Sequence, residues 1–217
     1  MLRFVAFDMD GTLVDVESSW AAVHAYFGDS NADGLRRFLA NEIDDREFVR
    51  TDVRVWWKHA PDLTIEDLER ILNDVPLMPG AGSLVAGLRE RGVRTAIVSG
   101  GIDVLARRIG RELGIDVVLA NGFRVTADGR LTGEGIIRVP IQEKEAVLAG
   151  LQEQLGFSPA ETASVGNSAI DVGLFRRSRM GIAFLPEDDE VRRAATHIVA
   201  DRDLAKVLPL LEAFPAG

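Results

Sequence analysis

The chain has 217 residues, of which 47% are hydrophobic and 27% charged, with a net charge of −9 and no cysteine. These values predict a globular protein with a real core, exclude disulfides and cysteine-based zinc sites, and disfavour a nucleic-acid partner, which binds cationic surfaces. No apolar run reaches the roughly 20 residues that cross a membrane, so a cytoplasmic enzyme is expected. The oligomeric state is left open.

Short apolar runs alternate with helix-like stretches through most of the chain. The first run, Val5-Ala6-Phe7, predicts a buried strand and not a signal peptide, because acidic residues follow it at once. Further strands are predicted at residues 95–98, 116–119, 162–165, 181–184 and 197–199, and helices at 82–91, 102–113, 142–155 and 204–214. This alternation predicts an α/β fold, a parallel sheet with helices on both faces and ligands beyond the carboxyl ends of its strands.

Residues 15–78 interrupt the alternation. Helix-like stretches are predicted at 18–27, 31–39, 44–59 and 64–73, and the last begins close to a capping box. We interpret this segment as a helical cap inserted after the first strand, which divides the α/β core into residues 1–14 and 79–217. A hairpin is predicted at 123–133, where Asp128-Gly129 forms a turn signal.

Two carboxylates, Asp8 and Asp10, directly follow the first predicted strand. Strand alternation puts them on the same side, where they repel each other unless a cation or proton lies between them. Carboxylate oxygens suit Mg²⁺. A solvated turn with two acids explains the pair about equally well, so the pair alone decides nothing.

Three further groups follow other predicted strands. Ser99-Gly100-Gly101 offers a hydroxyl and backbone N–H groups for phosphate oxygens. Lys144 opens a predicted helix, and the loop 166–171 ends in Asp171. Each alone is also typical of an ordinary turn or a solvated helix residue. Together they meet at one edge of one parallel sheet, which favours a phosphoryl-transfer site.

The order and spacing of these groups resemble the four motifs of the haloacid dehalogenase superfamily, and most closely its phosphoserine phosphatase branch. The likeness extends from Phe4 to Leu208. The matching segments are Asp8-Met9-Asp10-Gly11-Thr12, Val98-Ser99-Gly100-Gly101, the hairpin, Lys144 and Gly166 to Asp171, together with the helical insertion. The resemblance implies a Rossmann-like three-layer α/β core with a cap.

The resemblance also implies roles for residues. Asp8 is the expected nucleophile, forming an aspartyl-phosphate, and Asp10 the expected acid and base. Magnesium is expected on Asp8, Asp10 through its backbone carbonyl, Asn167 and Asp171. Phosphate is expected on Ser99, Gly100 and Lys144, and the rest of the substrate on Glu17, Gly101, Arg50 and Arg54. Glu17 matches the acid that receives the substrate's ammonium group in that branch.

Two departures from the family pattern bear on these roles. Asn167 stands where the family has Asp, and Ile170 where it has Asn, so we expect functional but weaker magnesium binding. The family's cap arginine falls on Val55, one residue beyond Arg54, and one residue on a helix turns a side chain by about 100°. Arg50 and Arg54 are as well explained by a solvated helix face.

The leading hypothesis is therefore hydrolysis of a small phosphorylated metabolite, with phosphoserine the first choice and no nucleic-acid or membrane partner. One alternative keeps the chemistry on another small phosphomonoester. The other is a weakly active phosphate-binding or regulatory relative, motivated by Asn167 and Ile170.

Overall fold

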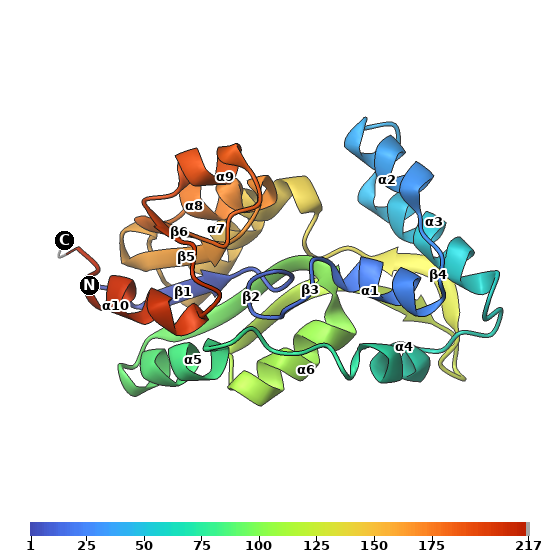
Figure 1. Cartoon of the computed structure of the whole chain (residues 1–217), viewed down its shortest axis with the longest axis horizontal. Coiled ribbons are helices and arrows are strands. Elements are labelled where there is room, and N and C mark those ends of the chain that lie inside the picture. The colour runs from blue at the N-terminus through green and yellow to red at the C-terminus, as the bar shows by residue number, and fades with distance from the viewer. Residues whose placement is uncertain (216–217) are drawn as a thin grey trace.

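The computed structural model describes residues 1–215 and contains a seven-stranded sheet in the order β4-β3-β2-β1-β5-β6-β7 (Figure 1). The strands are β1 (Phe4–Phe7), β2 (Arg94–Ile102), β3 (Val117–Val125), β4 (Leu131–Ile136), β5 (Thr162–Gly166), β6 (Met180–Phe184) and β7 (His197–Val199). Neighbouring strands in this sheet are parallel except β3 and β4, which form the predicted hairpin. The predicted α/β fold with a parallel sheet is confirmed.

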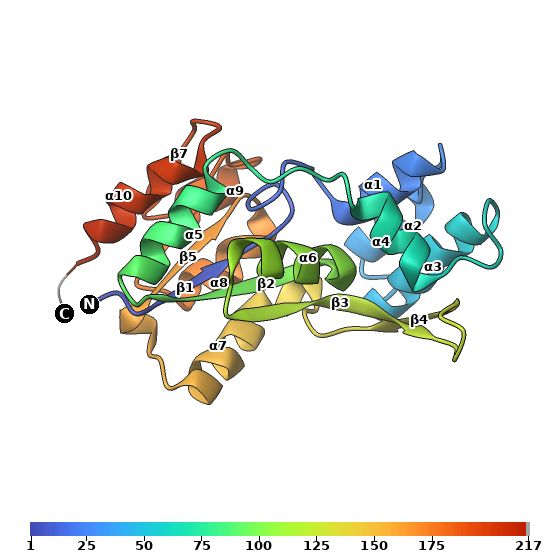
Figure 2. The same ribbon diagram turned by 90° about the horizontal axis from the view of Figure 1, so that it is seen from below.

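Helices cover both faces of the sheet. The helices are α1 (Ser19–Tyr26), α2 (Ala32–Leu39), α3 (Asp45–Trp57), α4 (Ile65–Leu72), α5 (Ala81–Glu90), α6 (Asp103–Leu113), α7 (Lys144–Leu155), α8 (Val172–Arg176), α9 (Asp189–Ala194) and α10 (Val207–Glu212). Figure 1 shows α7, α8 and α9 on one side of the sheet and α5 and α6 on the other, and Figure 2 shows α5 and α6 from below. The short helices α8 and α9 were not predicted.

Strand β1 divides the hydrophobic core between these two faces. Val5 and Phe7 pack into the cluster that includes the apolar side chains of α5 and α6, whereas Phe4 and Ala6 pack into the cluster of α7 and α8. All four residues are fully buried. The alternation of a strand thus places an entirely apolar run between two helical layers, as expected for a central parallel strand.

Four helices, α1 to α4, lie between β1 and α5, at the end of the molecule opposite the two termini (Figures 1 and 2). Each begins after a side chain that accepts a backbone N–H of the first turn: Ser18, Asn31, Asp44 and Thr64. The tip of the β3–β4 hairpin joins this group, because Ile65 N–H donates to the carbonyl of Gly129 at 2.9 Å. The division of the chain into core and cap stays our interpretation.

The strand register aligns the carboxyl ends that carry the predicted motifs. Phe7 pairs with Ile97 of β2 on one side and with Val165 of β5 on the other. The residues that follow these three positions therefore emerge at one edge of the sheet. Within residues 1–215, no helix is both long and apolar enough to cross a bilayer.

Candidate active site

Lys144 joins two buried carboxylates at the carboxyl edge of the sheet. Its Nζ lies 2.7 Å from Oδ1 of Asp8 and 2.7 Å from Oδ1 of Asp171. Asp8 leaves β1, Lys144 is the first residue of α7, and Asp171 closes the loop after β5. The side chains of Lys144 and Asp171 are only 3% and 0% exposed, so the structure brings together three of the predicted residues out of solvent.

The charges of this cluster do not balance. Burial and the neighbouring Asp171 raise the pKa of Asp8 to about 7, although Lys144 acts in the opposite direction. Burial alone would lower the pKa of Lys144, but Asp171 and Asp8 together raise it above its ordinary value. Lys144 is therefore a fixed cation. One ammonium faces two carboxylates, which leaves an excess of negative charge in a site of low dielectric constant.

Asp10 lies beside this cluster and is held by Ser19. The Oδ2 of Asp10 accepts the Ser19 N–H at 2.8 Å and the Ser19 hydroxyl at 2.7 Å. Its Oδ1 is buried and has no hydrogen-bond partner among residues 1–215. Burial raises the pKa of Asp10 to about 6, and the two bonds from Ser19 limit that rise. A carboxyl group with such a pKa can both donate and accept a proton near neutral pH.

The segment Ser99-Gly100-Gly101 differs from the prediction of a loop between strand and helix. It continues β2 with a register shift between Val98 and Ile102, and Ser99 Oγ accepts the Gly101 N–H at 3.1 Å. A side chain at position 101 does not fit, because its Cβ would lie 2.8 Å from Asp10 Oδ2 and 2.7 Å from Met9 Cε. Glycine is required here for close approach of the backbone to Asp10.

Trp20 ties the helical insertion to the same segment. Its Nε1–H donates to the carbonyl of Gly100 at 3.1 Å, and its ring stacks on Trp56. Asn121 of β3 donates to the same carbonyl at 3.3 Å. The carbonyl of Gly100 is therefore turned toward α1 and β3.

Asn167 is 4% exposed and lies beside Gly11. Its Nδ2 donates to Oε1 of Glu187 at 2.7 Å, a partner that no motif predicts. Burial, with Glu17, Asp171 and Asp188 adding to it, raises the pKa of Glu187. Ile170 is 44% exposed, so it does not contribute to the buried cluster.

Both oxygens of Asp171 are engaged. Oδ1 meets Lys144, and Oδ2 accepts the N–H groups of Asn167 at 2.9 Å and Ser168 at 3.2 Å. Asp171 thus fixes the position of Lys144 and shapes the loop after β5. Its expected role as a metal ligand stays a prediction.

The residues expected to bind the rest of the substrate are more dispersed. Glu17 is exposed. Arg50 pairs with Glu134 of β4 at 2.8 Å and with Glu47 at 3.1 Å, and Arg54 pairs with Glu47 at 3.0 Å. The side chain of Arg54 is 61% exposed. Both arginines are thus occupied by carboxylates of the protein, and their roles in binding substrate stay predictions.

The donor atoms of the site suit a hard cation. Its acidic oxygens outnumber its one ammonium, and Oδ1 of Asp10 and Oγ1 of Thr12 are buried without a partner among residues 1–215. Within the same residues, no group of three His, Asp or Glu side chains is gathered as a metal site. An oxygen-ligated Mg²⁺ here therefore depends on amide and backbone oxygens as well as carboxylates.

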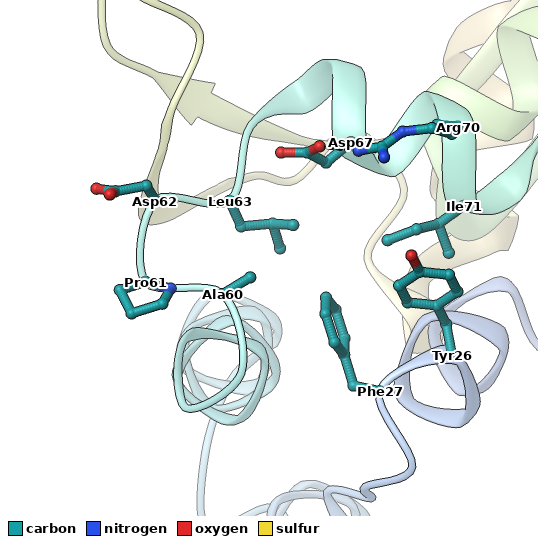
Figure 3. Close-up of a pocket in the computed structure, with 9 residues that line it drawn as sticks. All are labelled: Tyr26, Phe27, Ala60, Pro61, Asp62, Leu63, Asp67, Arg70 and Ile71. Carbon is teal, nitrogen blue, oxygen red and sulfur yellow. Dashed lines mark hydrogen bonds and ion pairs between the residues drawn. The ribbon is translucent and has the colours of Figure 1, made fainter.

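A separate pocket of about 300 Å³ lies within the helical insertion, between the end of α1, the segment 60–63 and α4 (Figure 3). The side chains of Phe27, Leu63 and Ile71 form its apolar part. Two of its charged residues, Asp67 and Arg70, pair with each other. Because this pocket contains none of the residues around Asp8, it does not form part of the candidate site.

Sequence reasoning missed Ser19 and Glu187, and it did not predict the hydrogen bond from Trp20 to the carbonyl of Gly100. The only signal for Ser19 was its place at the start of a predicted helix near Asp10. Nothing in the local pattern connects Asn167 with Glu187, which lies 20 residues further along the chain.

Comparisons with known proteins identify the family of this chain. The family model for haloacid dehalogenase-like hydrolases matches residues 5–176. A phosphoserine phosphatase of Archaeoglobus fulgidus is 35% identical over 185 residues, which are 84% of this chain and 52% of that protein. This chain therefore spans about half the length of that relative.

Two other relatives match along nearly their whole length. A phosphoserine phosphatase of Idiomarina loihiensis is 31% identical over 212 residues, covering 96% of this chain and 93% of that protein. The solved structure of a substrate-bound phosphoserine phosphatase complex has a TM-score of 0.81 at 25% identity, covering 97% and 98% of the two chains. The chain thus belongs to the haloacid dehalogenase-like hydrolases and lies in their phosphoserine phosphatase-like branch.

Proposed function

We propose that the protein is a magnesium-dependent phosphatase that hydrolyses a small phosphomonoester through an aspartyl-phosphate on Asp8. One observation carries the proposal: Lys144 Nζ holds Asp8 at 2.7 Å in a buried site, while Asp10 presents an unpaired oxygen from the same loop. This arrangement supports Asp8 as the nucleophile, Lys144 as the cation beside it and Asp10 as the acid.

In the first half of the proposed reaction, a carboxylate oxygen of Asp8 forms a bond to phosphorus as the bond to the ester oxygen breaks. A proton passes from Asp10 to the departing alcohol. Lys144 offsets the repulsion between the Asp8 carboxylate and the phosphate dianion, and it remains charged because its pKa is raised. The Ser99 hydroxyl and the Gly100 N–H are the expected donors to the phosphate oxygens, because the N–H groups of Gly101 and Ile102 already donate to Ser99 and Ser19.

In the second half, water attacks the phosphorus of the aspartyl-phosphate and gives a proton to Asp10. The bond between Asp8 and phosphorus breaks, and inorganic phosphate leaves. Magnesium, when bound, supplies additional positive charge to the phosphate oxygens. Its expected ligands are Asp8, the backbone carbonyl of Asp10, Asn167 and Asp171, directly or through water.

Phosphoserine is the first substrate to test, because two relatives that match this chain along nearly its whole length are phosphoserine phosphatases. Another small phosphomonoester is the second candidate. Its support is the pairing of Arg50 with Glu134 and Glu47, and of Arg54 with Glu47, which occupies the arginines that would hold a substrate carboxylate. A cytoplasmic setting is part of the same proposal.

A matched set of esters separates these candidates. Phosphoserine carries an ammonium and a carboxylate, phosphoethanolamine only the ammonium, and glycerol phosphate neither. Release of phosphate with Mg²⁺ gives kcat/KM for each. We expect phosphoserine to rank first and Glu17→Gln to lower kcat/KM for the two ammonium esters alone. Phosphoserine ranking among the poor substrates would reject it as the physiological choice.

The Asp8→Asn variant tests the chemistry itself. It keeps the shape of the side chain and removes the nucleophilic charge, so magnesium-dependent turnover is expected to vanish. If no ester is turned over and Asp8→Asn binds phosphate as the wild type does, the protein is a phosphate-binding relative instead.

A further inference from the structure

Ser19 occupies an unusual position at the start of α1. It is fully buried, yet its hydroxyl does not cap the helix, because Ser18 performs that role by accepting the Ala21 N–H at 3.3 Å. The hydroxyl of Ser19 is directed instead toward Asp10, on the loop after β1. Because this buried hydroxyl bonds a carboxylate outside its own helix, helix formation does not explain its presence.

The hydrogen bonds around Ser19 have a defined direction. Ser19 Oγ accepts the N–H of Ile102 at 3.0 Å and lies 2.7 Å from Asp10 Oδ2. The Ser19 hydroxyl hydrogen is therefore free to point at Asp10. The Ser19 backbone N–H donates to the same Oδ2 at 2.8 Å. Oδ2 thus receives two donors, whereas Oδ1 has no partner among residues 1–215.

We propose that Ser19 is a positioning residue that makes Oδ1 of Asp10 the atom that carries the acid–base proton. An oxygen that already accepts two hydrogen bonds is a poor place for a third hydrogen, so a proton on Asp10 goes to the oxygen without a donor. This inference rests on the proposed function, in which Asp10 protonates the departing alcohol.

Packing around Asp10 and Ser19 keeps the two side chains in this arrangement. A Cβ at Gly101 would lie 2.8 Å from both Asp10 Oδ2 and Ser19 Oγ, so the pair is tightly enclosed on that side. Ser19 also links the insertion to β2 through Ile102. If Ser19 were only a structural link, its loss would affect all esters equally. If it positions the proton, its loss should affect esters with a poor leaving group most.

Alkyl and aryl esters differ in how much the first step of the reaction depends on the Asp10 proton. The Asp8 oxygen bonds to phosphorus, the bond to the ester oxygen breaks, and the Asp10 proton neutralises the departing oxygen. An alkoxide needs that proton, whereas p-nitrophenolate leaves readily without it. The value of kcat/KM reports only the steps up to departure of the alcohol, so it isolates this proton from the later attack of water.

The experiment measures kcat/KM with Mg²⁺ for the alkyl phosphate that the wild type hydrolyses fastest and for p-nitrophenyl phosphate. We expect Ser19→Ala to lower kcat/KM for the alkyl ester about tenfold or more relative to kcat/KM for the aryl ester. The size of this effect is part of what a general acid contributes to the rate. Ser18→Ala, which removes the neighbouring hydroxyl that caps α1, is expected to leave the alkyl-to-aryl ratio unchanged. Ser19→Cys keeps the volume with a weak donor and serves if Ser19→Ala does not fold.

A second measurement places Ser19→Ala in an Asp10→Asn background. Without the acid, removal of Ser19 should not change the alkyl-to-aryl ratio further. The same ratio change in both backgrounds, or an unchanged ratio in Ser19→Ala and Ser19→Cys, would overturn the role of Ser19. Absence of turnover by the wild type on every ester would instead overturn the proposed function.

Discussion

Glu187 accepts a hydrogen bond from Asn167 Nδ2 at 2.7 Å and donates its own N–H to the Asn167 carbonyl at 2.8 Å. The carboxylate therefore fixes the orientation of the amide and leaves Oδ1 as its free oxygen. It also explains how an amide is accommodated at this position. An aspartate here would have no N–H group to donate to Glu187, and the two carboxylates would repel each other.

Changing Asn167 and Glu187 together should tighten magnesium binding more than changing either alone. Asn167→Asp adds a charge to the expected metal site but opposes Glu187, so we expect a small gain. The double variant Asn167→Asp with Glu187→Gln removes that repulsion, and its magnesium affinity should rise about tenfold over the wild type, or about 1.4 kcal/mol. Isothermal titration calorimetry with MgCl₂ measures the magnesium affinity of the single and the double variants. A double variant that binds no more tightly than the wild type contradicts the expectation.

Replacing Lys144 should abolish activity and weaken the fold. In Lys144→Met, Asp8 and Asp171 lose the ammonium that lies 2.7 Å from each. Removal of one partner from a buried ion pair costs about 3–5 kcal/mol, so urea unfolding should show a loss of that size. Lys58→Met, at an exposed lysine, is the matched control and should stay within about 0.5 kcal/mol of the wild type. Stability of Lys144→Met equal to the wild type would argue against the buried cluster.

The metal-free protein should gain stability when Asp10 is replaced by Asn. The pKa of Asp10 is raised to about 6 in the folded protein, against 3.8 for the unperturbed group. The folded state then holds the proton more tightly, so this group costs stability as pH rises from about 4 to 6, and the full cost remains above that range. Asn keeps an oxygen for the Ser19 donors.

We expect Asp10→Asn to stabilise the protein by about 1–3 kcal/mol at pH 8 in EDTA and by much less near pH 4. Urea unfolding at the two pH values gives the difference. An equal effect of Asp10→Asn at both pH values would contradict the raised pKa.

A methyl group at Gly101 should impair catalysis. Its Cβ would lie 2.8 Å from Asp10 Oδ2 and Ser19 Oγ, so Gly101→Ala must displace Asp10, the proposed acid. We expect kcat to fall by about tenfold or more, because a misplaced general acid loses most of its contribution. Gly82→Ala is the control, since its Cβ meets nothing within 4 Å in α5 and should stabilise by about 0.5–1 kcal/mol without changing kcat. Unchanged kcat in Gly101→Ala would contradict the close packing.

The strands, most of the helices and the hairpin could be predicted from the sequence because each depends on local patterns. The entirely apolar run before Asp8 needs a central parallel strand, and Thr64 with Asp67 forms the capping box that marks the start of α4. The continuation of β2 through Ser99 to Ile102 could not be predicted in this way. Its glycines indicate a turn locally, whereas in the structure Ile102 pairs with Asn121 of β3 beyond a register shift, and Gly101 packs against Asp10.

The sequence by itself determined that Asp8, Asp10 and Asp171 follow strands of one sheet, since order along the chain and strand alternation are local properties. The tertiary structure alone decided that Lys144 lies between Asp8 and Asp171, and that Ser19 selects one oxygen of Asp10. Those relationships join residues up to 136 positions apart. They depend on how helices pack over the sheet, and hydrogen-bond geometry of that kind leaves no periodic trace in the sequence.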